Sequence, residues 1–181
     1  GKFGEDGEPR ASPGHNLQLS AAGVLILWLG WVGFNGGSVL SADPELTSLT
    51  LVTTCIAAAA GGVSAAIFSN ILYKTYDLTM FMNGVLGGLV GITAGADQMS
   101  PMDATLIGII AGIILPLGVS LIDKLKLDDP VGAIAVHLIC GIWGTLAVGV
   151  FGAMASVDQF INQLIGVGVI GAFSVICAGI I

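Results

Sequence analysis

Six long apolar segments alternate with short polar ones along the chain. Each apolar segment is close to the ~20 residues that a helix needs to cross the hydrocarbon core of a bilayer. The separating segments hold proline and charged residues typical of turns, as in Ser41-Ala42-Asp43-Pro44-Glu45. The pattern therefore predicts an all-α, polytopic membrane helix bundle of about six transmembrane helices. They are expected at residues 17–40, 46–73, 80–97, 104–122, 130–153 and 160–181.

Composition agrees with a membrane protein. Of the 181 residues 55% are apolar and 9% are charged, whereas soluble domains have roughly 25% charged residues. Many of the 28 glycines lie inside apolar segments, where small residues let transmembrane helices approach closely. Three cysteines, Cys55, Cys140 and Cys177, show no metal or disulfide spacing, so we interpret them as packing residues and expect no metal or cofactor. The net charge of −7 gives no basic patch for nucleic acid.

The charged residues separate by side when the loops are assigned alternately to the two faces of the membrane. One side holds the loops 1–16, 74–77 and 123–130, and these contain every lysine and arginine of the chain. The charged residues of the loops on the other side are all acidic. The positive-inside rule makes the basic side cytoplasmic and predicts an even number of crossings. The alternative is a chance placement of five basic residues. The basic residues are Lys2, Arg10, Lys74, Lys124 and Lys126.

Both ends suggest a partial domain. Residues 1–16 are polar, contain no apolar stretch of a signal peptide, and are expected to form a cytoplasmic loop. The last apolar segment runs up to Ile181. We therefore expect residues 1–181 to be a single, partial transmembrane domain.

His137 is the one ionisable residue well inside an apolar segment. It lies seven residues into the fifth segment, about 10 Å from the cytoplasmic end of a helix. An ionisable residue at this depth indicates a functional site, although a histidine that bonds a neighbouring helix for packing is the alternative. Ala133, Gly141 and Gly144 share its helical face. This nearly bare face suits either close helix packing or an open lumen, and the sequence does not separate the two.

A mixed aromatic and polar face lies in the first apolar segment. Trp31, Phe34, Asn35 and Ser38 are spaced at i, i+3, i+4 and i+7, on one side of a helix. Such a face can hold a small cation by cation–π contact and hydrogen bonding. The alternative is an interfacial belt of aromatic residues. From the outside inward, the expected order is Ser38, then Phe34 and Trp31, then His137.

Several stretches resemble one transporter family. Leu27 to Ser38, LWLGWVGFNGGS, resembles the signature of the sixth transmembrane helix of the ammonium transporter (Amt/Mep/Rh) family. Residues 83–95 resemble helix eight, and Ser100-Pro101 with residues 107–112 resembles helix nine. The tenth helix is matched by Asp128-Asp129-Pro130, His137 and residues 140–145. The likeness covers nearly the whole chain in family order.

This resemblance implies a fold of eleven helices built from two inverted five-helix repeats, usually assembled as a homotrimer with one pore per subunit. The chain would supply helices six to eleven, which is the second repeat and most of the last helix. The implied function is transport of ammonium or ammonia, with methylammonium as an analogue, for nitrogen uptake across a bacterial-type plasma membrane. A PII-type regulator is an implied partner.

The same resemblance implies roles for four residues. Ser38 would recruit ammonium at the outer vestibule, and Phe34 would be one of two stacked gate phenylalanines. Trp31 would line the pore beneath the gate, and His137 would be the second of twin pore histidines. The other gate phenylalanine and the first histidine would come from the half that this chain lacks. One departure is that Gly132 and Leu138 stand where many members carry Asp and Gly.

Other function classes remain open at this stage. One is an ammonium-sensing, transporter-like domain of a signalling protein, and another is an Rh-type channel for small neutral solutes. An intramembrane enzyme is not expected, because one histidine without a buried carboxylate makes neither a metal site nor a catalytic pair. The net transported species, NH3 or NH3 with H+, is also left open.

Overall fold

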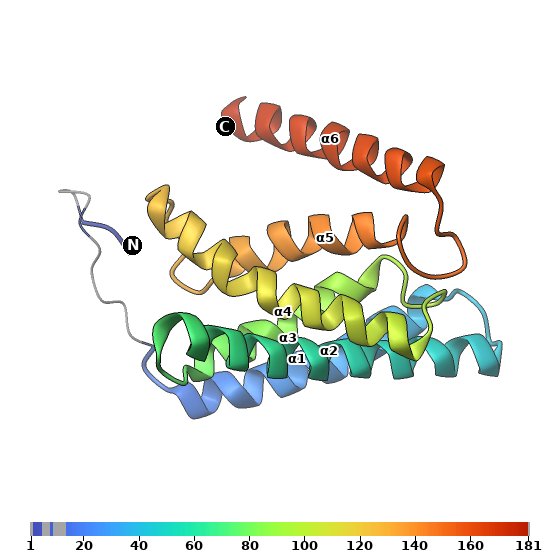
Figure 1. The fold of residues 1–181 in the computed structure, drawn as a ribbon, viewed down its shortest axis with the longest axis horizontal. Helices are drawn as coiled ribbons and strands as arrows, with labels where there is room; N and C mark the ends of the chain where they lie inside the picture. The colour runs from blue at the N-terminus through green and yellow to red at the C-terminus, as the bar shows by residue number, and fades with distance from the viewer. Residues whose placement is uncertain (1, 5–7, 9–13, 181) are drawn as a thin grey trace.

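The computed structural model describes residues 2–4, 8 and 14–180, and every regular element among them is a helix (Figure 1). This confirms the all-α prediction. Arg10 and most of the predicted 1–16 loop lie outside the described residues. The helices η1 and α5 are continuous and form one helical segment. The elements are α1 (Leu17–Ser38), α2 (Pro44–Tyr73), α3 (Leu78–Thr93), α4 (Pro101–Lys124), η1 (Ile134–Ile139), α5 (Cys140–Ala147) and α6 (Val157–Ile180).

Four of these helices are long and apolar enough to cross a membrane, namely α1, α2, α4 and α6. The other two apolar segments, α3 and Ile134–Ala147, are shorter. The 16 residues of α3 extend roughly 24 Å, less than the ~30 Å hydrocarbon core. The fifth expected segment, 130–153, is helical only over Ile134–Ala147. Gly132, shortly before this helical stretch, has a φ of 79°. This left-handed conformation suits glycine and interrupts an α-helix.

The polar residues between apolar segments fix where the helices begin. The side chains of Asn16, Asp43, Asp77 and Ser100 each accept a hydrogen bond from a backbone N–H in the first turn of the next helix. These caps satisfy donors that have no partner within the helix. Ser100 also forms a capping box with Asp103. The separators seen in the sequence therefore act as helix start signals.

Glycines bring α2, α3 and α4 into direct backbone contact. A Cβ atom placed on Gly88 of α3 or on Gly108 of α4 would collide with the carbonyl oxygen of Ala57 in α2. Gly61 and Gly84 face each other in the same way. This close approach of small residues is the packing expected of membrane helices. It makes these three helices the closely packed centre of the described residues.

The connections gather at two ends of the bundle (Figure 1). The start of α1, the turn between α2 and α3, and the loop after α4 lie at one end, and the other three connections lie at the opposite end. Lys2 Nζ lies 2.6 Å from Asp123 Oδ1 and ties the N-terminal segment to the end of α4. The helix α6 contacts α5 alone among the helices described, and none of its described residues is buried.

Candidate functional site

Three of the predicted site residues lie side by side. The ring centroid of Trp31 lies 6.2 Å from that of Phe34, with the planes at 79°. On its other side Trp31 lies 6.4 Å from the imidazole of His137, with the planes only 17° from parallel. Helix α1 supplies the two aromatic residues and η1 supplies the histidine. We call Phe34, Trp31 and His137 the aromatic row.

Most of this row faces outward. The Phe34 side chain is 59% exposed, His137 is exposed and Trp31 is partly buried. Among the described residues no hydrogen bond to the His137 ring is found, and its ring partner is Trp31. The alternative of a histidine bonded to a neighbouring helix is therefore not what the geometry shows. An exposed imidazole on a helix of a membrane bundle is available to a solute or to another segment.

Thr93 holds the central ring of the row. The indole Nε1–H of Trp31 donates to Thr93 Oγ1 at 2.7 Å, and the Thr93 hydroxyl in turn donates to the carbonyl oxygen of Leu89 at 2.7 Å. The bond crosses from α1 to α3 and fixes the ring plane of Trp31. Sequence reasoning missed Thr93 as a site residue, since the one signal was a hydroxyl in an otherwise apolar segment.

Asn35 does not lie in the aromatic row. Its helical spacing had predicted that it would share one face of the helix with Trp31 and Phe34. Its side chain is 3% exposed, and its Nδ2 donates to Thr54 Oγ1 of α2 at 3.0 Å. The reason is that a buried amide needs a partner and α2 supplies one. This contact sets the rotation of α1 about its axis and leaves Phe34 pointing outward.

Ser38 is the last residue of α1, one turn beyond Phe34. Its hydroxyl donates to the carbonyl oxygen of Phe34 at 2.7 Å, and the residue is exposed. Because the proton is directed at the backbone, the oxygen lone pairs remain available to accept. A ligand with N–H donors therefore fits this hydroxyl better than an anion does.

A π-helical turn separates His137 from the packed face of its helix. The segment Ile134–Ile139 is π-helical and α-helix resumes at Cys140. Gly144 lies against the backbone of Gly91 in α3, where a Cβ atom would collide. The bare face expected around His137 thus divides into a packed part at Gly144 and an exposed part at His137. The wide turn allows this division, because it inserts one residue into the helical repeat.

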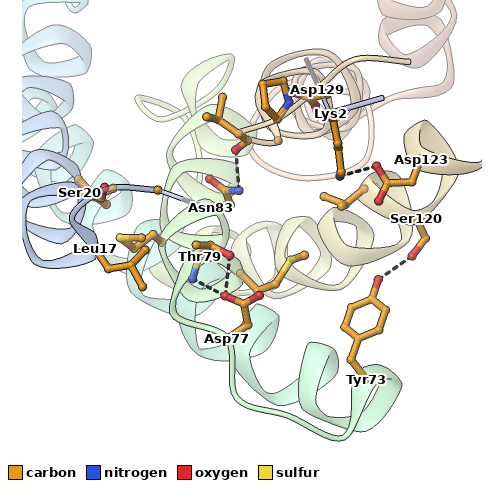
Figure 2. Close-up of a pocket in the computed structure, with 18 of the residues that line it drawn as sticks. Lys2, Leu17, Ser20, Tyr73, Asp77, Thr79, Asn83, Ser120, Asp123 and Asp129 are labelled. Carbon is orange, nitrogen blue, oxygen red and sulfur yellow. Dashed lines mark hydrogen bonds and ion pairs between the residues drawn. The ribbon is translucent and has the colours of Figure 1, made fainter. Parts of the chain in front are cut away.

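A cavity lies at the end of the bundle where the predicted cytoplasmic loops meet, and Figure 2 shows its lining. It has a volume of about 1090 Å³, and its lining includes His15, Thr75 and Asp123 from the three predicted cytoplasmic loops. Neither His137 nor the two aromatic residues of the row line this cavity. The aromatic row predicted from the sequence therefore lies outside this cavity, and its members Phe34 and His137 are exposed.

Asp129 corrects the expectation that no carboxylate is buried. It lies beside this cavity (Figure 2) and is 6% exposed. Its position directly before the fifth apolar segment made it look like an ordinary loop residue. Among the described residues there is no group of three or more histidine, cysteine or acidic side chains that could hold a metal ion.

Comparison with known proteins identifies the family. The sequence model of the Ammonium Transporter Family matches residues 1–181. This chain belongs to the ammonium transporter family. It is 46% identical over 151 residues to the ammonium transporter Amt2 of Archaeoglobus fulgidus. This match covers 83% of this chain and 32% of that protein. It is 37% identical over 175 residues to ammonium transporter 1 member 3 of Solanum lycopersicum, covering 90% of this chain and 38% of that protein.

Solved structures of the ammonium transporter family agree with the fold. A structure described as a sensor Amt protein superposes with a TM-score of 0.86 at 38% identity, over 93% of this chain and 44% of that one. Saccharomyces cerevisiae Mep2 gives a TM-score of 0.85 at 27% identity, over 92% of this chain and 41% of that one. The family and fold predictions are confirmed. The chain spans about a third of the length of the curated relatives it matches.

Proposed function

We propose that this ammonium transporter chain forms part of a transmembrane pathway for ammonium or ammonia, with the aromatic row as one wall. The observation that carries the proposal is the nearly parallel pair of Trp31 and His137 on an exposed face of membrane helices. The family match supports ammonium as the substrate. The opposite wall would come from the part of the longer relatives that this chain does not span.

The chemistry of the row fits a cation that loses its charge on the way. Ser38 offers acceptor lone pairs at the mouth, and the ring faces of Phe34 and Trp31 attract a cation. Deeper in the membrane the charged form of the solute is disfavoured by desolvation. The imidazole of His137 can then accept a hydrogen bond or pass a proton inward. This sequence of contacts needs no metal or cofactor and breaks no covalent bond of the solute other than N–H.

We also infer the orientation and the partners. The described basic residues lie on the segments that meet at one end of the bundle, which supports a cytoplasmic position for residues 1–16; they are Lys2, Lys74, Lys124 and Lys126. A bacterial-type plasma membrane, a homotrimeric assembly and a PII-type regulator follow from the family resemblance. These three inferences, on location, assembly and regulation, concern the complete protein.

Transport is favoured over a sensing function. The similar solved chain described as a sensor Amt protein raises that second possibility, but the curated relatives of Archaeoglobus fulgidus and Solanum lycopersicum are named as transporters. An Rh-type channel for neutral solutes would conduct CO2 in preference to methylammonium, so a flux comparison of the two solutes separates it from the proposed function.

The test is methylammonium uptake by the complete protein, including any residues beyond these 181, with His137→Ala. We expect uptake to fall about tenfold or more, because the row loses its polar inner member. His15→Ala is the matched control, since His15 is exposed and lies outside the helices. Equal uptake by the parent, His15→Ala and His137→Ala would remove His137 from the pathway.

A further inference from the structure

Asp129 is a buried carboxylate that has backbone donors for partners. It is the one acidic or basic side chain among the buried residues described, at 6% exposure. Its Oδ1 accepts from the N–H of Ala133 at 2.7 Å and its Oδ2 accepts from the N–H of Ile134 at 2.9 Å. The salt bridge found in this region pairs Lys2 with Asp123 instead. A buried charge needs such compensation, so the carboxylate and the two N–H groups stabilise each other.

These two N–H groups open the helical segment that carries His137. Donors at a helix start have no partner inside the helix, and a negative charge there also interacts favourably with the helix dipole. The segment continues as the π-helical turn Ile134–Ile139. Wide turns of this kind are rare and occur frequently at functional sites. The anchor and the unusual turn are therefore adjacent.

A second tether holds the same loop. Asn83 of α3 donates from Nδ2 to the carbonyl oxygen of Val131 at 3.0 Å (Figure 2). Gly132 has a φ of 79°, and a Cβ atom there would lie 2.7 Å from Asn83 Nδ2. The loop that enters η1 thus fits closely against α3.

The far end of the segment is fixed as well. Gly144 lies directly against Gly91, and Trp143 Nε1 donates to the carbonyl oxygen of Ile107 at 3.1 Å. His137 lies between these contacts and the Asp129 anchor. These contacts restrict the rotation of the π-helical turn, in which the imidazole is nearly parallel to the Trp31 ring, with the planes 17° apart.

We infer that Asp129 is a positioning residue for His137: its carboxylate holds the first turn of the π-helical segment and thereby sets the imidazole against Trp31. The inference rests on the proposed function, because the position of His137 matters for flux only if the aromatic row lines the pathway. Asp129 acts through the backbone and touches neither the solute nor the imidazole.

Asp129→Asn tests the inference, with Asp128→Asn as the matched control. The asparagine keeps the shape of the side chain but replaces one acceptor by a donor, so one of the two N–H groups loses its partner. Asp128 is the exposed neighbour, and its Oδ1 accepts from the Lys2 backbone N–H at 2.6 Å. Methylammonium uptake is measured in the complete protein, and Vmax is normalised to the amount of folded protein recovered by size-exclusion chromatography.

The second readout is the reaction of each histidine with diethyl pyrocarbonate, followed by mass spectrometry of the peptides. His15 is the internal reference, since it is exposed. Because His15 and Asp129 line the same cavity, the labelling of His15 in each variant is first compared with that in the parent. For Asp129→Asn we expect Vmax to fall about tenfold, KM to change less than about twofold, and the labelling ratio of His137 to His15 to differ clearly from that of the parent. Asp128→Asn should match the parent in all three.

The outcomes separate the inference from the proposed function. If His137→Ala transports like the parent, the proposed function fails whatever Asp129 does. If His137→Ala loses uptake while Asp129→Asn matches Asp128→Asn in flux and labelling, the positioning role alone is overturned. Should Asp129→Asn yield no folded protein, Asn83→Ala, which removes the second tether, is read in the same way. Unchanged flux and labelling in that variant would equally reject the role.

Discussion

Trp31 is the residue on which the geometry of the aromatic row depends. Its indole N–H is bonded to Thr93, while its ring is flanked by Phe34 and by His137. The polar edge of the side chain therefore fixes its orientation, and the π-faces stay available for contact. A tryptophan held in this way offers a cation a preformed surface without a cost in side-chain ordering.

Thr93→Val tests this arrangement. Valine has nearly the same shape as threonine but cannot accept the indole N–H, and a donor left without its partner costs about 1–3 kcal/mol. We expect a lower melting temperature in detergent and weaker methylammonium uptake. Thr105→Val is the control, because the Thr105 hydroxyl donates to Pro101 within α4. If the two variants behave alike, Thr93 does not orient Trp31.

The sequence was informative for some site residues and not for others. Helical spacing put Trp31 and Phe34 together, and an imidazole in an apolar segment singled out His137. Asn35 was misplaced, because spacing alone does not reveal that its amide bonds Thr54 of α2. Asp129 was missed, since a carboxylate beside a proline reads as a loop residue until its backbone partners are known.

At the level of helices, α3 is fixed by glycine contacts rather than by large apolar side chains. Gly84 and Gly88 place its backbone against α2, and this close approach brings Thr93 within reach of Trp31. The same helix supplies Asn83 to the loop before η1. One short helix thus sets the position of both the tryptophan and the histidine segment.

Gly88→Ala is expected to disturb this packing. The added Cβ would meet the Ala57 carbonyl oxygen, a backbone atom that cannot move away alone, so overpacking costs about 1–3 kcal/mol. Gly30→Ala in α1 has nothing within 4 Å of its Cβ and should be neutral or slightly stabilising, since alanine favours a helix by about 1 kcal/mol over glycine. Thermal unfolding in detergent measures both, and equal melting temperatures would contradict the packing argument.

Helix positions followed well from the apolar pattern, and helix ends followed less well. The starts at Pro44 and Pro101 are set by the caps Asp43 and Ser100. The fifth expected segment was too long, because neither the positive φ of Gly132 nor the end of α5 at Ala147 can be recognised from hydropathy. The π-helical turn around His137 likewise cannot be predicted from the pattern of apolar and polar residues.

At the scale of the whole molecule, the described helices form a bundle with a closely packed centre. Its exposed surface includes Phe34 and His137 of the aromatic row. Phe34 and Leu29 are both well exposed on α1, at 59% and 73%, yet they lie on different faces of the helix. Exposure alone therefore does not distinguish a residue that lines a pathway from one that faces lipid. The proposed function does distinguish them, because only the face of the aromatic row should meet water.

The most direct measurement is the reaction of Phe34→Cys in the complete protein, freed of other cysteines, with a membrane-impermeant cationic methanethiosulfonate added from outside. The account predicts that Phe34→Cys is modified, that methylammonium slows the modification, and that modification blocks uptake, whereas Leu29→Cys stays unreactive. Equal reactivity at the two positions, or modification of Phe34→Cys from the cytoplasmic side only, would contradict it.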